Sequence, residues 1–232
     1  MSCPVCNSED VKSFTMRKFS PFVGRTPKKE NFSVEYFICN DCGLIFCPEM
    51  ISWSKEKFSE MCYNDGYKKY DMDIVTPNGR RQNMSFNFIK ENLPKGMTNL
   101  DYGGGNGYLS DILNKNGYPS KTYDPFTKFN DTSVLNNKYD FVSCIEVLEH
   151  SYNILDVAKQ ISDASGGIIY VSTGIYDNVE SFDKWYYFNP RVGHILLFRK
   201  KTIEALFGKL GYYIKKISIM EHEQMNILLR AE

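Results

Sequence analysis

Four cysteines near the start of the 232-residue chain have the spacing of a metal site. Cys3 and Cys6 form one Cys-x-x-Cys pair, and Cys39 and Cys42 form a second pair that is followed by glycine. Two such turns supply four thiolates that can close a tetrahedral Zn²⁺ site. The long gap between the pairs fits a zinc ribbon with an inserted hairpin, and a module this small would be stabilised by its metal.

Three further cysteines, Cys47, Cys62 and Cys144, have no partner at ligand spacing. Cys47 remains an alternative for one of the four ligands. We expect Cys144 to be a small buried residue in a strand. An odd count of seven cysteines, four of them clustered, favours metal binding in a reducing compartment over disulfide formation.

A glycine-rich stretch, LDYGGGNGYLSDIL, joins a strand-like run to a helix-like run over residues 100–113. Glycines at the end of a buried strand let the backbone turn sharply and approach a ligand, while the next helix offers its N–H groups. Residue 108 is Tyr, so the G-x-G-x-x-G dinucleotide pattern is not met. Asp101 precedes the glycines, and Asp124 follows the next strand, where a carboxylate can bind both hydroxyls of a ribose. These acids favour a nucleotide-like ligand with a neutral or cationic tail.

Two glutamates and a histidine have spacings that suit acid–base chemistry. Glu146, Glu149 and His150 lie at i, i+3 and i+4, which predicts one shared face of a turn or helix. A histidine pKa near ~6.5 suits a general base at neutral pH. His194 is the first candidate for that base and His150 the second. His222, the third histidine of the chain, lies in a polar turn and is expected to be a solvated surface residue.

Strand and helix patterns alternate along most of the chain after residue 80. A helix is predicted from Arg80 to the residue before Pro94. We expect strands at 97–102, 120–124, 138–147 and 166–173, helices at 108–117, 153–164 and 200–211, and closing strands at 212–220 and 225–230. This order predicts an α/β fold with a doubly wound, mostly parallel sheet, and the last two strands predict an antiparallel hairpin at one edge.

Composition changes along the chain predict three parts. Residues 1–50 form the zinc ribbon, interrupted by a Pro/Lys-rich loop at 20–31. Residues 51–79 are polar and aromatic and are expected to form one or two linking helices, and residues 80–232 form the main domain.

Overall composition excludes several classes of protein. Hydrophobic residues make up 42% of the chain and charged residues 24%, which is typical of a globular protein. The 28 basic residues balance the 28 acidic residues, so no global field favours nucleic acid or an anionic membrane. We find neither a signal-peptide pattern nor an apolar run of the ~18 residues that span a bilayer. A cytoplasmic protein without a membrane partner is therefore expected.

Three motifs in register resemble the class I S-adenosylmethionine (SAM) dependent methyltransferases. They are LDYGGGNGYL, the acid of TYDPF, and YDFVSCIEVLEH, and the resemblance covers about residues 80 to 232. It implies a Rossmann-like fold in which the glycine loop holds the amino acid part of SAM and Asp124 holds its ribose. The cofactor residues implied are Asp101, Tyr102, Gly103, Gly105, Gly107, Asp124 and Glu146. The short segment from Asp124 to Tyr139 implies a third strand reduced to a stub.

In a subset of this family, including ubiquinone-type O-methyltransferases and small-RNA 2′-O-methyltransferases, an E-x-x-E-H motif and a later histidine bind a divalent cation. The similar residues here, which would bind Mg²⁺ or another divalent ion, are Glu146, Glu149, His150 and His194. EVLEH also occurs in relatives without a metal, so a metal-free transfer in which a histidine takes the proton stays open.

The segment SFDKWYYFNPRVGHILLF is dense in aromatic residues, and in relatives resembling this chain a similar segment lines the substrate pocket. Trp185, Tyr186 and Tyr187 can stack on a sugar or an aromatic ring. The alternative is that half of these aromatics belong to the core.

Methyltransferases with an N-terminal CxxC…CxxCG ribbon, which this chain resembles, often belong to sugar, polysaccharide or secondary-metabolite pathways. We therefore expect methyl transfer to a hydroxyl, less readily to nitrogen or carbon, of a small molecule or saccharide. One alternative is an RNA methyltransferase whose ribbon grips RNA, but only RTPKKEN and FRKK are locally basic. Another is a non-catalytic partner with a SAM fold, which the intact loop and Asp124 disfavour. The sequence predicts no oligomeric state.

Overall fold

The computed structural model describes residues 1–19, 32–63, 79–219 and 224–232. The predictions for the loop at 20–31, for His222 and for the part of the linking segment at 64–78 lie outside the described residues.

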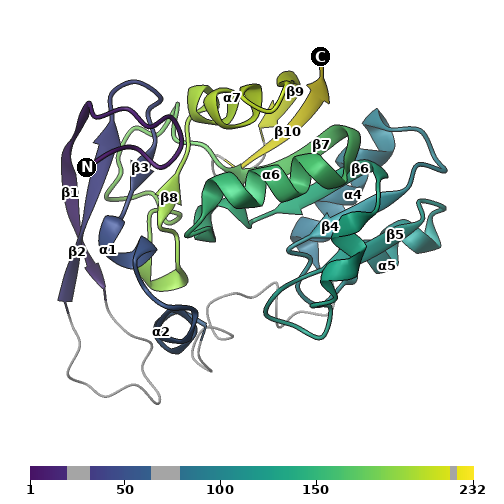
Figure 1. The fold of residues 1–232 in the computed structure, drawn as a ribbon, viewed down its shortest axis with the longest axis horizontal. Helices are drawn as coiled ribbons and strands as arrows, with labels where there is room; N and C mark the ends of the chain where they lie inside the picture. Colours follow the sequence, from purple (N-terminus) through teal and green to yellow (C-terminus); the bar gives the residue numbers. More distant parts are fainter. Residues whose placement is uncertain (20–31, 64–78, 220–223) are drawn as a thin grey trace.

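Six strands form the larger of two sheets: β4 (Asn99–Tyr102), β5 (Ser120–Tyr123), β6 (Tyr139–Ile145), β7 (Ser165–Gly174), β9 (Tyr212–Ile219) and β10 (Gln224–Ala231). Their order across the sheet is β5-β4-β6-β7-β10-β9 (Figure 1). The first four run parallel, whereas β10 pairs antiparallel with both β7 and β9. The predicted parallel sheet with an antiparallel hairpin at one edge is confirmed.

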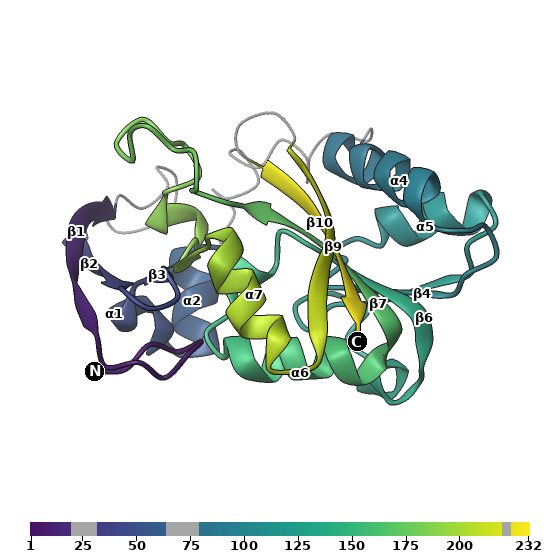
Figure 2. The same ribbon diagram turned by 90° about the horizontal axis from the view of Figure 1, so that it is seen from above.

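Helices cover both faces of this sheet: α4 (Arg80–Asn92), α5 (Tyr108–Lys115), α6 (Ile154–Ala164) and α7 (Lys200–Gly208). Successive residues of a strand point to opposite faces. Phe141 of β6 accordingly joins a cluster with Phe88 of α4 and Leu113 of α5, while its neighbour Val142 joins the cluster of Ile161 of α6. Figure 2 shows α4 and α5 on one side of the strands and α6 on the other. The doubly wound arrangement is therefore as predicted.

The connection between β5 and β6 differs from the prediction. It forms a 3₁₀ helix, η2 (Thr132–Asn136), and no strand of the described sheet arises from it. The Asp131 side chain accepts the N–H of Ser133 at the start of η2, and the Tyr139 hydroxyl donates to Val134 O at 3.0 Å. These bonds pair polar groups of the short connection locally, without a third strand. β5 is therefore the edge strand of the sheet.

The second sheet is built mostly from the N-terminal residues. Its strands are β1 (Val11–Phe19), β2 (Phe32–Cys39), β3 (Ile45–Phe46) and β8 (Leu196–Leu197), in the order β1-β2-β3-β8. β1 and β2 pair antiparallel, as expected for the inserted hairpin. The fourth strand, β8, comes from the other end of the chain. Residues 1–50, which we call the cysteine module, therefore share a sheet with the main domain.

Short helices complete the fold: α1 (Pro48–Ile51), α2 (Lys55–Met61), η3 (Leu148–His150) and η4 (Pro190–Val192). α2 lies in the segment that was expected to hold linking helices. One hydrophobic cluster runs from Val5 and Leu44 of the cysteine module to Ile203 and Phe207 of α7. Within the described ranges, no helix has the length and apolarity needed to cross a membrane.

Candidate active site

The glycine loop leaves the carboxyl end of β4 between β5 and β6. Three of its residues have φ of 71°, 56° and 81°, which favours glycine: Gly103, Gly105 and Gly107. A Cβ at position 103 would collide with Val147, whereas a Cβ at Gly105 would have no atom within 4 Å. The loop is thus packed against the β6–η3 connection on one side and open on the other, where a ligand can approach the backbone.

Asp101 lies beneath this loop and is buried. Its Oδ1 accepts the Ser143 hydroxyl at 3.2 Å, while Oδ2 has no hydrogen-bond partner among the described residues. Burial raises the pKa of the Asp101 carboxyl to about 7 against the hydrogen bond from Ser143, and the charge of Asp124 raises it further. A buried carboxyl with an unpaired oxygen is stabilised in its charged form by a nearby cation. Together with the open backbone of the loop, it fits the cationic amino acid part of SAM.

Asp124 stands at the end of β5, beside the same loop. One carboxylate oxygen accepts the N–H of Gly105 at 3.0 Å, and the other accepts the N–H of Phe126 at 2.8 Å. An ionised carboxylate has about four lone-pair sites, so it can still accept two hydroxyl groups. Its position is therefore compatible with the predicted ribose contact.

Tyr102 and Glu146, two other predicted cofactor residues, lie in different surroundings. The Tyr102 ring packs beside Tyr123, and its hydroxyl donates to Gln160 of α6 at 2.7 Å, so its side chain is directed to the core. Glu146 follows β6 with φ of 53°, and its N–H donates to Ser172 O at 2.9 Å. This left-handed conformation is uncommon for a residue other than glycine and ends the strand at the site.

Glu149, His150 and His194 form a cluster whose ligand atoms all lie within 4.8 Å of one another. Glu149 and His150 belong to η3, and His194 lies two residues before the start of β8. Glu146, the fourth predicted ligand, lies outside this group. The left-handed turn at Glu146 and the 3₁₀ geometry after it break the i, i+3, i+4 relationship that holds on an α-helix.

Hydrogen bonds fix the orientation of both imidazoles. The Nδ1 atom of His150 bonds Gly193 O at 3.0 Å, and Nδ1 of His194 bonds Tyr187 O at 2.5 Å. Because a carbonyl can only accept, each Nδ1 carries a proton, and in the neutral form of either imidazole Nε2 then offers a lone pair. Histidines that bind metal ions typically donate the other ring N–H to a carbonyl or carboxylate in this way.

Glu149 supplies the carboxylate of this cluster and is buried. Its Oε2 accepts the Thr173 hydroxyl at 3.0 Å, and Oε1 lies 3.9 Å from His150 Nε2. Burial raises the pKa of Glu149, and burial together with the neighbouring His150 holds the pKa of His194 well below its usual range. Two imidazoles and a carboxylate form a donor set that suits several divalent ions.

The predicted substrate aromatics divide between core and surface. Trp185 and Tyr187 are buried and stack at 5.3 Å between ring centroids, and the Tyr187 ring lies 4.1 Å from that of His194. Tyr186 is 55% exposed. Tyr187 therefore lines the histidine cluster, while Tyr186 lies at the surface.

Tyr63, after α2, is a site residue that no sequence motif indicates. Its ring lies 5.8 Å from the His150 ring and 5.9 Å from the Phe126 ring, so it joins the loop of Asp124 to the histidine cluster. The Lys55 ammonium of α2 also donates to Pro125 O at 3.3 Å. The only signal in the sequence was the aromatic character of the linking segment.

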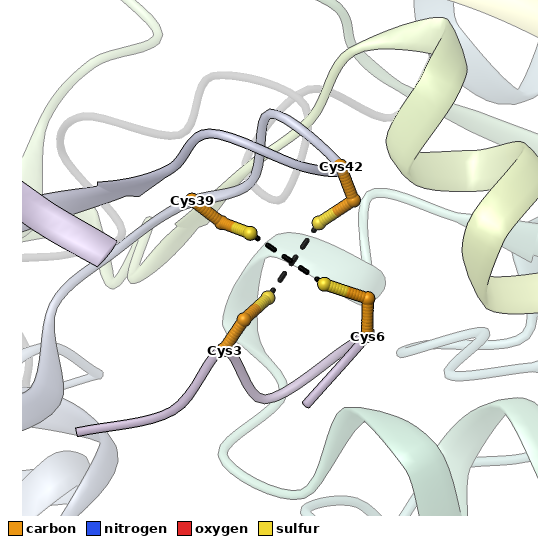
Figure 3. Close-up of side chains that lie close together, drawn as sticks. All are labelled: Cys3, Cys6, Cys39 and Cys42. Atoms are coloured by element: carbon orange, nitrogen blue, oxygen red, sulfur yellow. Dashed lines mark hydrogen bonds between the residues drawn. The ribbon is translucent and has the colours of Figure 1, made fainter. Parts of the chain in front are cut away.

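The four predicted metal-binding cysteines also come together. Figure 3 shows the side chains of Cys3, Cys6, Cys39 and Cys42 converging on one point from two turns. The sulfur atoms of Cys3 and Cys42 lie 3.5 Å apart, as do those of Cys6 and Cys39. Sulfurs around a tetrahedral Zn²⁺ with Zn–S bonds near 2.3 Å stand about 3.8 Å apart. The donor set and its geometry fit a structural zinc ion.

The other cysteines lie outside this group. Burial raises the pKa of the Cys47 and Cys62 thiols to about 12, and Cys144 is buried in β6 as predicted.

In the locally basic segment FRKK, Arg199 pairs with Asp177 at 3.2 Å and Lys200 with Glu204 at 3.5 Å. Acidic neighbours therefore offset this patch. The RTPKKEN segment lies outside the described residues.

Comparisons with known proteins agree with this geometry. Residues 79–217 match a family model described as "Methyltransferase domain". The fold is similar to that of a Burkholderia thailandensis 1,6-didemethyltoxoflavin-N1-methyltransferase with bound 1,6-didemethyltoxoflavin and S-adenosylhomocysteine. The TM-score is 0.58 at 10% identity, over 83% of this chain and 97% of that one. It is similar to TnmH at a TM-score of 0.57 and 13% identity, covering 76% of this chain and 61% of that one.

A third similar structure is magnesium protoporphyrin IX methyltransferase from Synechocystis PCC 6803 with bound S-adenosylhomocysteine. The TM-score is 0.50 at 16% identity, over 66% of this chain and 83% of that one. No curated protein matches the sequence. At identities this low, the likenesses establish a common fold and leave the acceptor open.

Proposed function

The chain belongs to the class I SAM-dependent methyltransferase family, and from that premise we propose that it transfers a methyl group from SAM to a hydroxyl of a small molecule or saccharide. The observation that carries the proposal is the contact between two sites. The glycine loop packs on Val147, two residues before Glu149, so the cofactor cradle adjoins the Glu149–His150–His194 cluster.

In this proposal the glycine loop and its flanking acids bind the cofactor. The backbone of Gly103, Gly105 and Gly107 holds the amino acid part, with Asp101 charged beneath it. Asp124 accepts the ribose hydroxyls. Bound in this way, SAM supplies an electrophilic methyl group on a sulfonium, and the chain has only to orient an acceptor oxygen in line with it.

The Glu149–His150–His194 cluster would bind the acceptor hydroxyl, with a divalent ion or without one. A divalent ion held by the Glu149 carboxylate and the two Nε2 atoms would lower the pKa of a bound hydroxyl. Without the ion, the Nε2 lone pair of His194 or of His150 would take the proton. The low pKa of buried His194 makes it a weak base, which favours its role as a ligand.

A small or saccharide acceptor is supported by the surroundings of the cluster. Tyr63 and the exposed Tyr186 offer faces for a sugar or an aromatic ring. Two basic residues of FRKK, Arg199 and Lys200, pair with acidic neighbours, which disfavours an RNA contact at that segment. We further propose a zinc ion at the four cysteines, a ribbon at 1–50, linking helices at 51–79, a methyltransferase domain at 80–232, and action in the cytoplasm.

The experiment that tests this function is a screen with methyl-labelled SAM over sugar nucleotides, quinol precursors and RNA. Label transferred to a hydroxyl of a small molecule, and lost in Asp124→Ala, is the expected result. Salt-sensitive RNA binding with label in RNA would favour the RNA alternative. Absence of both SAM binding and transfer would favour a non-catalytic partner.

A further inference from the structure

Three successive backbone carbonyls around His194 are held by three different elements. Gly193 O accepts Nδ1 of His150 at 3.0 Å, and His194 O accepts the Tyr36 hydroxyl at 2.7 Å. Ile195 O accepts the N–H of Cys47 at 2.9 Å. Tyr36 and Cys47 both belong to the cysteine module, so two of the three bonds cross from that module to the candidate active site.

The same segment is tied to the carboxylate side of the cluster. The N–H of Ile195 donates to Glu149 O at 2.9 Å. Pairing of β3 with β8 then continues the contact, with Ile45 opposite Leu197 and Phe46 opposite Leu196 (Figure 1). The backbone at His194 therefore lies between η3 on one side and the cysteine module on the other.

Tyr36 is suited to a fixed role in this contact. It is fully buried in β2, and its ring meets Phe188 edge-on at 4.8 Å. Because a backbone carbonyl can only accept, the Tyr36 hydroxyl is the donor in its bond to His194 O. A buried donor of this kind leaves an unsatisfied carbonyl when it is removed.

The proposed metal site is part of the same connection. Tyr36 lies three residues before the ligand Cys39 on β2. After β8 the chain returns to the metal loop, because the Thr202 hydroxyl of α7 donates to Cys42 O at 2.8 Å. The Tyr176 hydroxyl also donates to Gly43 O. The cysteine module is thus hydrogen-bonded to the rest of the chain both at His194 and at the start of α7.

We infer that the cysteine module is a structural wall of the active site, and that Tyr36 is a positioning residue that holds the His194 backbone so that its imidazole faces Glu149 and His150. The consequence for catalysis rests on the proposed function. It is that the zinc site supports methyl transfer without contacting SAM or the acceptor. Tyr36 acts through His194 and touches neither.

The test compares two buried tyrosine hydroxyls of the same interface. Tyr36→Phe removes the bond to His194 O, while Tyr176→Phe removes the bond to Gly43 O and serves as the matched control. Both variants are prepared with zinc and labelled with ¹⁵N-histidine, and the imidazole signals are assigned with His150→Asn, His194→Asn and His222→Gln.

Tyr36→Phe is expected to shift the ¹⁵N signals of His194, and Tyr176→Phe is expected to leave them at the wild-type positions. Mn²⁺ titration should show affinity about three- to tenfold lower in Tyr36→Phe, as for one lost hydrogen bond. Unchanged His194 signals in Tyr36→Phe, or equal shifts in both variants, would overturn the inference. A wild type that binds neither SAM nor Mn²⁺ would contradict the proposed function, and the comparison of His194 signals would still decide the positioning role.

Discussion

The carboxylate of Asp124 accepts the N–H of Gly105 at 3.0 Å, so the acid at the end of β5 holds the glycine loop at the end of β4. This bond fixes the position of Gly105, the residue on the open side of the loop. It joins the two parts of the cofactor site, which are separated along the chain by all of α5.

Asp124→Ala should therefore weaken SAM binding twice, by removing the ribose acceptor and by releasing Gly105. We expect SAM affinity at least about tenfold lower, since hydrogen bonds to a charged group contribute about 1.5–3 kcal/mol. Calorimetry with SAM measures this change. Asp111→Ala, an exposed acid in the first turn of α5, is the control and should bind SAM as the wild type does.

The pKa of Asp101, about 7 against 3.8 in an unfolded chain, predicts a pH-dependent stability. The folded state binds this proton more tightly, so its contribution is complete below pH 3.8 and is lost as pH rises toward 7 and above. Loss of the whole contribution amounts to about 4 kcal/mol at most. Asp101→Asn should raise the free energy of unfolding of the SAM-free protein at pH 8 and weaken its SAM binding.

Asp140 on β6 is the matched control for this titration. Bonds from the Thr98 N–H and hydroxyl lower its pKa, so it contributes stability above its unfolded pKa and loses it in acid. Asp140→Asn should therefore lower stability at pH 8, opposite in sign to Asp101→Asn. Chemical denaturation from pH 4 to 8 measures the free energy of unfolding of both variants. If neither substitution stabilised the protein at pH 8, or if both did, the assignment of Asp101 would be contradicted.

The Glu149–His150–His194 cluster should hold one divalent ion in addition to zinc. Glu149→Gln keeps the shape of the side chain and removes its charge, so Mn²⁺ affinity should fall about 10- to 100-fold. Glu204→Gln, at the exposed Lys200 pair on α7, is the control. His194→Ala should abolish transfer to the true acceptor, and unchanged turnover in this variant would end its role as ligand and as base.

The cysteine module should contain one zinc ion per chain. Cys39→Ser and Cys42→Ser should lose zinc and lower the melting temperature, because the module gains much of its stability from metal. Cys47→Ser, a buried thiol outside the cluster, should retain one zinc. Metal analysis by mass spectrometry gives the count, and a well-folded, metal-free wild type would contradict the site.

Features set by local sequence could be predicted, and features set by contacts between distant segments could not. Alternation of strands and helices predicted the main sheet, and cysteine spacing predicted the four sulfurs that converge. β3 pairs with β8 from the other end of the chain, and the bond from Tyr36 to His194 joins residues 158 positions apart. No periodicity in either segment signals such a contact.

The sequence predicted the kind of candidate site and some of its residues. Helical spacing grouped Glu146 with Glu149 and His150, but the left-handed turn at Glu146 removes it from the cluster. The aromatic segment was expected either to line a pocket or to belong by half to the core, and Trp185 and Tyr187 are buried. Tyr63 was missed because its role depends on where α2 lies in the fold.

The most direct test of the central claim is a calorimetric titration of the zinc-loaded wild-type protein with SAM. We expect one site per chain with a dissociation constant in the micromolar range, weakened by Asp124→Ala and unaffected by Asp111→Ala. Absence of heat from binding at high micromolar SAM, with the protein folded, would contradict the assignment of the glycine loop as a SAM cradle and the function built on it.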